Sequence, residues 1–179
     1  ALKLAESYGM DVIILDHHII EDRLEYDLVI HPDLLPESYT GLCGAGVVLQ
    51  LIKSFDHHDP LYEILAMVAT IADMVEMFNA NRLITINGLQ LLNTIGFLPI
   101  NAILKVNDQI NEETIAYQFI PAINTVGRLA DIANANVLVE YLLATDPTII
   151  YKTAKSIMEL NDKRKDMVNN ADNDKDQTF

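Results

Sequence analysis

The sequence predicts an α/β fold in which a parallel sheet is followed by a mostly helical region and a long final helix. Two short apolar runs, DVIIL at 11–15 and DLVIHP at 27–32, are rich in β-branched residues and bounded by polar ones. Such runs are typical of strands buried on both faces of a parallel sheet. A helix, a strand, a loop and a second short strand in this order are typical of a doubly wound α/β unit.

The chain of 179 residues is long enough for one domain with a sizeable core, or for one piece of a larger protein. No stretch reaches the roughly 18 uninterrupted apolar residues of a membrane span, and the first residues lack the features of a signal peptide. The single cysteine, Cys43, excludes a disulfide framework and a zinc site built on cysteine pairs. We therefore expect a soluble protein of the reducing cytoplasm.

The net charge of −14 argues against a simple basic patch for nucleic acid. It does not exclude a nuclease, because a metal-dependent site concentrates carboxylates and the bound cations reverse the local charge. The acidic composition is therefore compatible with a metal-dependent enzyme that acts on nucleic acid.

Glycines mark the ends of the first predicted helices. Residues 2–9 (LKLAESYG) predict the second half of an amphipathic helix closed by Gly9, so we expect the chain to begin inside a structural unit. Residues 41–55 (GLCGAGVVLQLIKSF) predict a turn that runs into a helix, one face of which is formed by Val47, Leu51 and Phe55. Residues 61–75 are apolar almost all round and predict a buried helix that contains Asp73.

From residue 81 onward the pattern is mostly helical. The predicted helices are 81–96, which ends at Gly96, 99–106, which begins at Pro99, and then 111–120, 131–145 and 146–170. Residues 121–129 (PAINTVGRL) follow neither the helical nor the strand period of apolar residues and are expected to be irregular. The expected organisation is a core domain over 1–145, a connector helix over 146–170 and a disordered tail over 171–179, which is too polar to pack.

The triplet Asp-His-His occurs twice, and its first copy, at 16–18, directly follows the first predicted strand. In open α/β sheets, ligands bind at the carboxyl ends of the strands. A carboxylate and an imidazole in that position suit Mn²⁺ or a similar divalent ion. The alternative is a polar loop whose histidines cap the end of a strand.

The second copy, at 56–58, follows a predicted helix and precedes Asp59 and Pro60. These two residues predict the N-cap and the first residue of the next helix. Histidines near a helix C-terminus are favoured by the helix dipole without any ligand. We therefore interpret the second triplet as an exposed loop.

Asp73 lies within the apolar segment ATIADMVEM at 69–77. A carboxylate is costly to bury unless it is paired, hydrogen-bonded or bound to a metal. Asp73 is therefore a candidate metal ligand, and the alternative is a buried aspartate that caps a neighbouring element.

Four segments, taken in order, resemble the DHH phosphoesterase superfamily and, within it, the RecJ single-strand-specific exonucleases. They are GMDVIILDHH at 9–18, CGAGVVLQLI at 43–52, ATIADMVEMFNANR at 69–82 and PAINTVGRL at 121–129. The long final helix is similar to the family's connector to a second domain. The resemblance implies the C-terminal part of a parallel-sheet DHH-type domain, because the family's N-terminal aspartate motifs and C-terminal domains have no counterpart in this sequence.

The resemblance also implies roles for individual residues. His17 and Asp73 would bind one Mn²⁺ or Mg²⁺ ion. Asp16 and His18 would be catalytic, since Asp16 would support the site and His18 would face the scissile phosphate. Contacts to the substrate would come from Arg82, Asn124 and Arg128, although Arg82 could equally form a structural ion pair.

Some positions bear on packing or depart from the family pattern. Gly44 and Gly46 are expected to allow close packing, because a lone Gly-x-Gly is a weak signal for a phosphate loop. His31 and Ala122 stand where many relatives have asparagine and arginine, which affects the expected substrate contacts.

The activity implied by the resemblance is metal-dependent hydrolysis of phosphodiester bonds by a 5′→3′ exonuclease of single-stranded DNA in recombination and repair. Its two-metal site would be only partly encoded here, so the fragment itself is expected to be inactive. Expected partners are single-stranded DNA, a single-strand-binding protein and a helicase. Two alternatives stay open: an oligonucleotide or cyclic-dinucleotide phosphodiesterase of the same superfamily, and a non-catalytic DHH-like replication scaffold.

Overall fold

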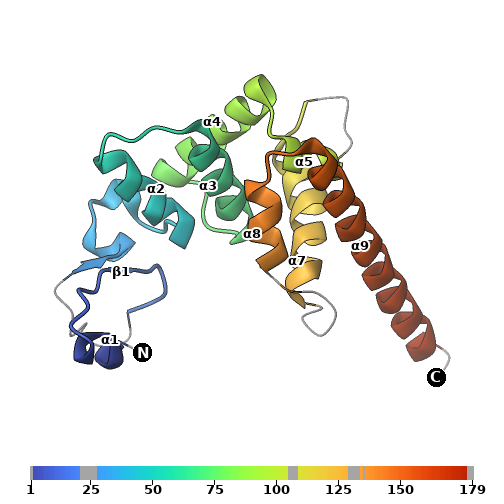
Figure 1. The fold of residues 1–179 in the computed structure, drawn as a ribbon, viewed down its shortest axis with the longest axis horizontal. Coiled ribbons are helices and arrows are strands. Elements are labelled where there is room, and N and C mark those ends of the chain that lie inside the picture. The colour runs from blue at the N-terminus through green and yellow to red at the C-terminus, as the bar shows by residue number, and fades with distance from the viewer. Residues whose placement is uncertain (1, 21–27, 105–108, 129–133, 135, 177–179) are drawn as a thin grey trace. The chain divides into compact units, whose positions relative to one another are not determined.

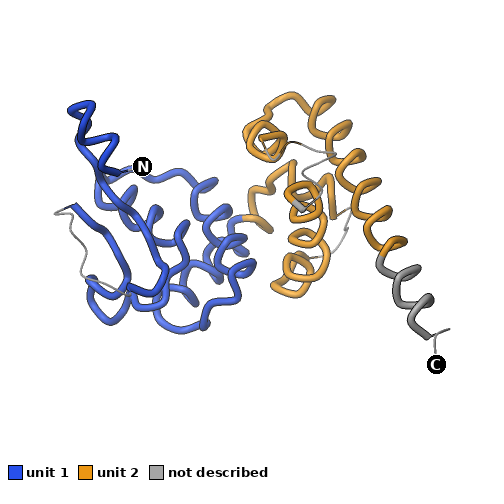
Figure 2. Tube along the Cα trace, turned by 90° about the horizontal axis from the view of Figure 1, so that it is seen from below, with its two compact units in different colours: residues 1–91 blue, residues 92–179 orange. Residues whose placement is uncertain are grey.

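The computed structural model describes residues 2–20, 28–104, 109–128, 134 and 136–176, with side chains as far as Met167 except that of Arg128. The chain divides into two compact units, residues 1–91 and 92–179 (Figure 2). Each unit is described by itself below.

The first unit begins with helix α1 (Leu2–Ser7), which ends as the sequence predicts. Gly9 has a φ of +70°, and the N–H of Met10 donates to the carbonyl of Ala5 while that of Gly9 donates to Glu6. This pair of bonds is the Schellman motif, in which glycine tolerates the left-handed conformation at no steric cost.

Strands β1 (Ile14–Leu15) and β2 (Val29–Ile30) form a parallel pair in which Ile14 lies opposite Val29 (Figure 1). The predicted parallel pairing is confirmed, but the strands are shorter than expected. Burial on both faces is wrong, because Ile13 and Leu28 beside the strands are exposed. Within the described part of the chain, each strand has one hydrogen-bonded neighbour, and α2 is the helix that packs against β1.

Two turns of 3₁₀-helix, η1 (Pro32–Leu34) and η2 (Glu37–Tyr39), lead into helix α2 (Gly44–Ser54), which packs on α3 (Pro60–Ala72). The core of this pair contains the fully buried side chains of Val47, Ile64 and Met67. The predicted apolar face of α2 is wrong at Phe55, which is 74% exposed. Phe55 is the C-cap of the helix and Asp56 after it has a φ of +58°, so the chain turns away from that face.

Helix α4 (Asn79–Ile95) confirms the predicted helix that ends at Gly96, whose φ is +72°. Gly88 on this helix lies directly against α3. A Cβ atom at Gly88 would stand 2.3 Å from the Cβ of Met67 and 2.9 Å from the carbonyl oxygen of Glu63. The absence of a side chain at Gly88 is therefore what lets the two helices approach so closely.

The second unit consists of helices. They are the last turn of α4, α5 (Leu98–Leu104), α6 (Glu112–Thr114), the π-helix η3 (Ile115–Phe119), α7 (Ile120–Arg128), α8 (Asn136–Leu143) and α9 (Pro147–Asp176) (Figure 1). Helices α5 and α7 both pack on α9. The largest buried side chains of this core include Ile100, Ile115, Phe119, Tyr141, Ile150 and Ile157.

The expectation of an irregular segment from Pro121 onward is wrong, because α6, η3 and α7 follow one another without a break over residues 112–128. Proline inside a helix lacks an N–H, and its ring clashes with the carbonyl four residues earlier. The π-helical stretch η3 precedes Pro121 directly. A π-helix has wider turns than an α-helix, and this widening accommodates the proline without ending the helix.

Helix α9 confirms the predicted long helix and begins with an N-cap bond from the N–H of Thr148 to the carboxylate of Asp146. It continues to Asp176, into the segment 171–179 for which we expected no structure. The last residues, 177–179, and the predicted helix positions 105–106, 131–133 and 135 lie outside the described residues. The domain boundaries at 145 and 170 stay a prediction.

In the described ranges, no single helix has both the length and the apolar character needed to cross a membrane. Helices α4 and α5 pass that test only as a bent pair, taken together across the break between them.

Candidate functional site

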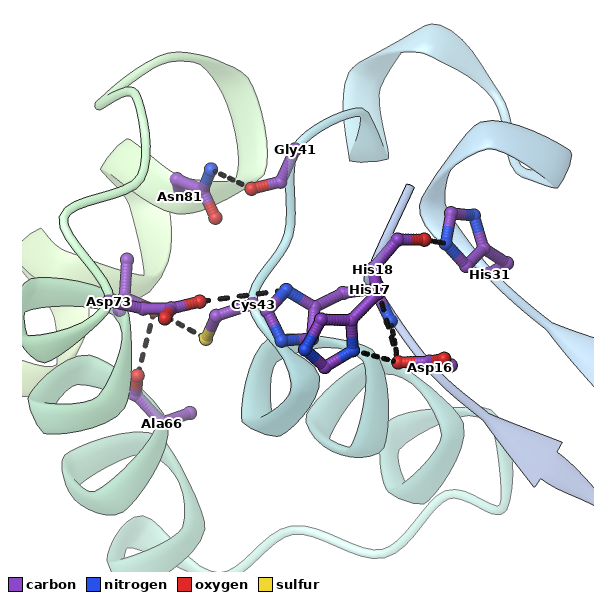
Figure 3. Close-up of polar contacts among 10 residues, drawn as sticks. Asp16, His17, His18, His31, Gly41, Cys43, Ala66, Asp73 and Asn81 are labelled. Carbon is purple, nitrogen blue, oxygen red and sulfur yellow. Dashed lines mark hydrogen bonds and ion pairs between the residues drawn. The ribbon is translucent and has the colours of Figure 1, made fainter. Parts of the chain in front are cut away.

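The first Asp-His-His triplet lies where the sequence predicts, immediately after β1 (Figure 3). Oδ1 of Asp16 accepts hydrogen bonds from the backbone N–H of His17 at 2.7 Å, from that of His18 at 3.2 Å, and from Nδ1 of the His18 ring at 2.7 Å. These bonds, the one from the His18 ring above all, lower the pKa of Asp16 to about 2. Asp16 is therefore ionised at neutral pH and organises the turn that carries both histidines.

His17 and Asp73 approach each other from different elements. Nδ1 of His17 lies 3.5 Å from Oδ2 of Asp73, and the two side chains are 26% and 44% exposed. His17 follows β1, whereas Asp73 is the C-cap of α3 (Figure 3). An imidazole and a carboxylate thus converge in a place that solvent can reach.

The predicted burial of Asp73 inside a helix over 61–75 is wrong. Helix α3 ends at Ala72, and Met74 has a φ of +52°, a left-handed conformation that turns the chain away from the helix axis. Asp73 consequently lies at the end of the helix and is exposed. Burial therefore gives no reason to regard Asp73 as a ligand, whereas its approach to His17 within 3.5 Å does.

The N-terminus of α2 forms one wall of the site. A Cβ atom at Gly44 would lie 3.4 Å from Cδ2 of the His17 ring, and one at Gly46 would lie 3.0 Å from Cδ2 of Leu42. Both glycines therefore stand at close contacts, as the sequence analysis expected. Gly44 in particular leaves the space that the imidazole of His17 occupies.

His31 supports the triplet from the neighbouring strand, a role that the sequence analysis missed. It follows β2, is only 3% exposed, and its Nε2 lies 2.8 Å from the carbonyl oxygen of His18. The N–H of Asp33 donates to Nδ1 of His31, which leaves Nε2 as the nitrogen that donates to the carbonyl of His18. The position of His31 directly after the second predicted strand could have indicated this role. The carboxyl ends of parallel strands lie at the same edge of a sheet, so residues that follow the two strands lie close together.

Asn81 was also missed, although it stands beside Arg82 in one of the motif segments. Its buried Nδ2 donates to the carbonyl of Gly41 at 2.9 Å (Figure 3). The same Nδ2 donates to the carbonyl of Glu76 at 3.0 Å. It thus joins the turn before α2 to the loop that follows Asp73.

Cys43 lies beneath the site and has a packing role. Its thiol is buried and lies 3.6 Å from the hydroxyl of Thr70, which itself donates to the carbonyl of Ala66 (Figure 3). Both residues join α2 to α3.

The predicted substrate-binding residues fall in both units. Arg82 is exposed on the first turn of α4, and within the described residues it forms no ion pair, so the alternative of a structural pair finds no support there. Asn124 is exposed on α7, in the second unit. Arg128 is the last residue of α7, and its side chain lies outside the described part.

The second triplet has the structure that the sequence predicts for it. Asp59 caps α3 by accepting from the N–H of Leu61 at 2.8 Å, and Pro60 is the first helical residue. Nε2 of His58 lies 3.4 Å from Oδ1 of Asp56, and all three side chains of the triplet are exposed. This triplet forms the loop between α2 and α3.

His17 and Asp73 together provide two groups that could bind a metal ion. In the portion of the chain that the structure describes, no cluster of three or more histidine, cysteine, aspartate or glutamate side chains is arranged to hold one. The described geometry therefore supplies a nitrogen donor and an oxygen donor, with the ionised Asp16 beside them.

The relatives that this chain resembles in sequence are single-stranded-DNA-specific exonucleases. No family model matches the chain. The chain is 34% identical over 175 residues to the single-stranded-DNA-specific exonuclease RecJ of Bacillus subtilis, covering 93% of this chain and 22% of that protein. It is 27% identical over 162 residues to the RecJ of Thermus thermophilus, covering 87% of this chain and 24% of the relative. The chain therefore spans about a quarter of the length of these relatives.

Solved structures agree with the sequence comparison. A crystal structure of exonuclease RecJ bound to manganese matches 92% of this chain and 43% of its own chain, with a TM-score of 0.74 and 23% identity. The RecJ of Thermus thermophilus in complex with Mn²⁺ matches 92% of this chain and 26% of its own, with a TM-score of 0.77 and 27% identity. The resemblance inferred from the four motif segments is thus confirmed: over nearly its whole length, this chain is similar to one segment of the RecJ family of single-stranded-DNA-specific exonucleases.

Proposed function

We propose that this chain is part of a metal-dependent exonuclease that hydrolyses the phosphodiester bonds of single-stranded DNA from the 5′ end. The observation that supports this most directly is the approach of His17 to within 3.5 Å of Asp73, at the carboxyl end of a parallel strand. Relatives that share this segment are exonucleases of single-stranded DNA. Since the chain spans about a quarter of them, the activity belongs to the whole protein that contains it.

Mn²⁺ or Mg²⁺ is the cofactor that the donor set fits, and RecJ crystal structures have been solved with each of these ions. His17 and Asp73 would bind one ion through nitrogen and oxygen, both of which suit Mn²⁺. Octahedral ions of this kind take about six ligands, so the other ligands would come from water and from parts of a RecJ-type protein that this chain does not span. When bound, divalent ions lower the pKa of an attacking water and stabilise charge on the leaving oxygen.

Of the other two members of the triplet, Asp16 would hold the turn that carries the histidines, and His18 would contact the substrate. Asp16 holds the backbone of His17 and His18 through Oδ1, which keeps the His17 ring directed toward Asp73. His18 is 80% exposed, so its ring is free to contact a phosphate oxygen of the scissile bond. Its hydrogen bond from Nδ1 to Asp16 would hold the ring in one orientation during that contact.

Arg82, Asn124 and Arg128 would contact phosphates or sugars along the strand. Arg82 lies in the first unit, is exposed and has no ion-pair partner among the described residues, so its charge is available for a phosphate. Phosphate contacts of this kind set affinity and register but not sequence preference. A role in recombination and repair in the cytoplasm, beside a single-strand-binding protein and a helicase, completes the proposal.

The second triplet provides the control for the experiment that tests the proposal. Mn²⁺ binding by the whole protein is measured by calorimetry for the wild type, His17→Ala, Asp73→Asn and His57→Ala. His17→Ala and Asp73→Asn should each weaken Mn²⁺ binding by at least about tenfold, the scale of losing a supporting group at a metal site. His57→Ala removes the same side chain from the same tripeptide and should leave the affinity unchanged.

Release of nucleotides from a 5′-labelled single strand in Mn²⁺ then tests the reaction itself. Equal Mn²⁺ affinity in all four proteins would refute the assignment of the ligands. A strong preference for substrates of a few nucleotides over long strands would refute the proposed substrate in favour of an oligonucleotide phosphodiesterase.

A further inference from the structure

A cavity in the second unit lies between helices α7 and α9. Its volume is about 270 Å³, and it is lined by Ile120, Pro121, Asn124, Thr125 and Arg164. Small-molecule sites usually have volumes of roughly 300 Å³ or more. The cavity is therefore near the lower end of that range and has room for a small group such as one phosphate.

The guanidinium of Arg164 is incompletely satisfied within the protein. Its Nε is buried and has no hydrogen-bond partner among the described residues. Its Nη2 donates to Oδ1 of the buried Asn161 across a long 3.4 Å, and the same oxygen also accepts from the hydroxyl of Thr125 at 3.2 Å. A buried donor without an acceptor is unfavourable, so the described residues leave N–H donors of the Arg164 guanidinium unpaired.

Among the described residues, no carboxylate forms an ion pair with Arg164. Elsewhere on α9, Lys155 lies 3.9 Å from Glu159 and Lys165 lies 3.8 Å from Asp162, both on the surface. Arg164 has no such carboxylate partner in the part of the helix that the structure describes. The chain has a net charge of −14, yet the described residues that line this cavity include an arginine and no carboxylate. This combination favours the binding of an anion.

The other lining groups determine which anion fits. Asn124 is exposed at the cavity and can donate through its amide, while Ile120 and Pro121 provide apolar contacts. A guanidinium matches the oxygens of a phosphate with paired N–H donors. Apolar contacts beside such donors suit the sugar that is attached to a phosphate in a nucleic-acid strand.

We propose that Arg164 and Asn124 bind one backbone phosphate of a single-stranded DNA substrate at this cavity. The inference rests on the proposed function, because it places part of the substrate on the second unit. It assigns a substrate contact to α9, a helix that the resemblance treats only as a connector.

The test measures how tightly the whole protein binds a fluorescently labelled oligo(dT) strand, with fluorescence anisotropy as the readout. No metal is added, so that the strand stays intact. Arg164→Ala should weaken binding by about tenfold, the loss expected of a charge-assisted hydrogen bond. The slope of log K against log salt should fall by about 0.7, the value for one phosphate contact on a single strand. Lys163→Ala removes a charge from the exposed neighbouring position of α9 and serves as the matched control.

Asn124→Asp is the second variant, since Arg164→Ala could destabilise the protein by removing the bond to Asn161. Asn124 is exposed, so the aspartate should leave the melting temperature unchanged while its charge repels the phosphate. Asn124→Asp is expected to weaken binding as Arg164→Ala does, and Arg164→Lys by less, because lysine keeps the charge but not the planar fork.

Binding by Asn124→Asp and Arg164→Ala that equals binding by Lys163→Ala would overturn the inference. Hydrolysis of single-stranded DNA in Mn²⁺ would in that case still stand, and the proposed function with it. If the whole protein neither bound nor hydrolysed single-stranded DNA, the proposed function would fail and the inference would fail with it.

Discussion

Nδ1 of His17 lies 3.5 Å from Oδ2 of Asp73, although the first residue follows a strand near the start of the chain and the second ends helix α3. The contact depends on three local features. Asp16 fixes the turn after β1, Gly44 leaves room for the imidazole, and the left-handed Met74 ends the helix at Asp73. These features make the pair the centre of the candidate site.

The first prediction concerns catalysis by this pair. In the whole protein, His17→Ala and Asp73→Asn should each lower the rate of single-strand hydrolysis in Mn²⁺ by about 100-fold or more, because each removes a metal ligand. His57→Ala should change that rate by less than about twofold, as for a surface substitution. The rate is measured from nucleotides released at saturating DNA and graded Mn²⁺. A rate loss in His57→Ala as large as that in His17→Ala would show that the wrong triplet was assigned.

The second prediction concerns His31. His31→Ala leaves the carbonyl of His18 without its side-chain donor and should lower the free energy of unfolding by about 1–3 kcal/mol. His31→Gln keeps an N–H donor on a side chain of similar reach and should recover part of the loss. Urea denaturation of both variants measures the effect. Equal stability of His31→Ala and wild type would mean that the triplet does not depend on this support.

The third prediction concerns Asn81. Asn81→Ala removes the donors to the carbonyls of Gly41 and Glu76, and should reduce the free energy of unfolding by about 2 kcal/mol. Asn87→Ala on the exposed face of the same helix is the control and should be neutral or slightly stabilising, since alanine is the better helix former. Thermal or urea unfolding distinguishes the two. A loss in Asn87→Ala equal to that in Asn81→Ala would contradict the role of the buried amide.

The fourth prediction compares two helical glycines. Alanine is favoured over glycine inside a helix by up to about 1 kcal/mol, and Gly127→Ala should stabilise accordingly, because a Cβ there meets nothing within 4 Å. Gly88→Ala should instead destabilise by about 1–3 kcal/mol through overpacking against Met67 and the carbonyl of Glu63. The unfolding midpoint of each variant is compared with that of the wild type, and the sign of the difference tests each expectation. A stabilised Gly88→Ala would mean that α3 and α4 separate readily.

The sequence was sufficient to predict how the two triplets differ. The first follows a strand and the second precedes an Asp-Pro helix start, and both placements depend on short-range patterns. Gly9 and Gly96 marked helix ends for the same reason. Features of this kind are encoded within a few residues, so the sequence alone predicts them.

Other features of the site depend on contacts that no local pattern reveals. The end of α3 at Ala72 rests on the left-handed conformation of Met74, a residue type that rarely adopts it, so the pattern extended the helix too far. Pro121 predicts a break, but the π-helical stretch before it keeps the helix continuous. The roles of His31 and Asn81 depend on carbonyls that are distant in the sequence.

The hydrogen bonds of Asp16 have one more consequence. All three that the described residues provide are accepted by Oδ1, and none by Oδ2. The two oxygens of this carboxylate therefore have different roles. Oδ1 sets the conformation of the turn, and Oδ2 can accept a hydrogen bond or bind a ligand that is not part of the turn. In Asp16→Asn the amide oxygen can take the place of Oδ1 while the amide nitrogen takes that of Oδ2. This substitution would preserve the shape of the turn and remove the acceptor at Oδ2. Replacing one oxygen by nitrogen would therefore separate the structural role of Asp16 from its role as an acceptor.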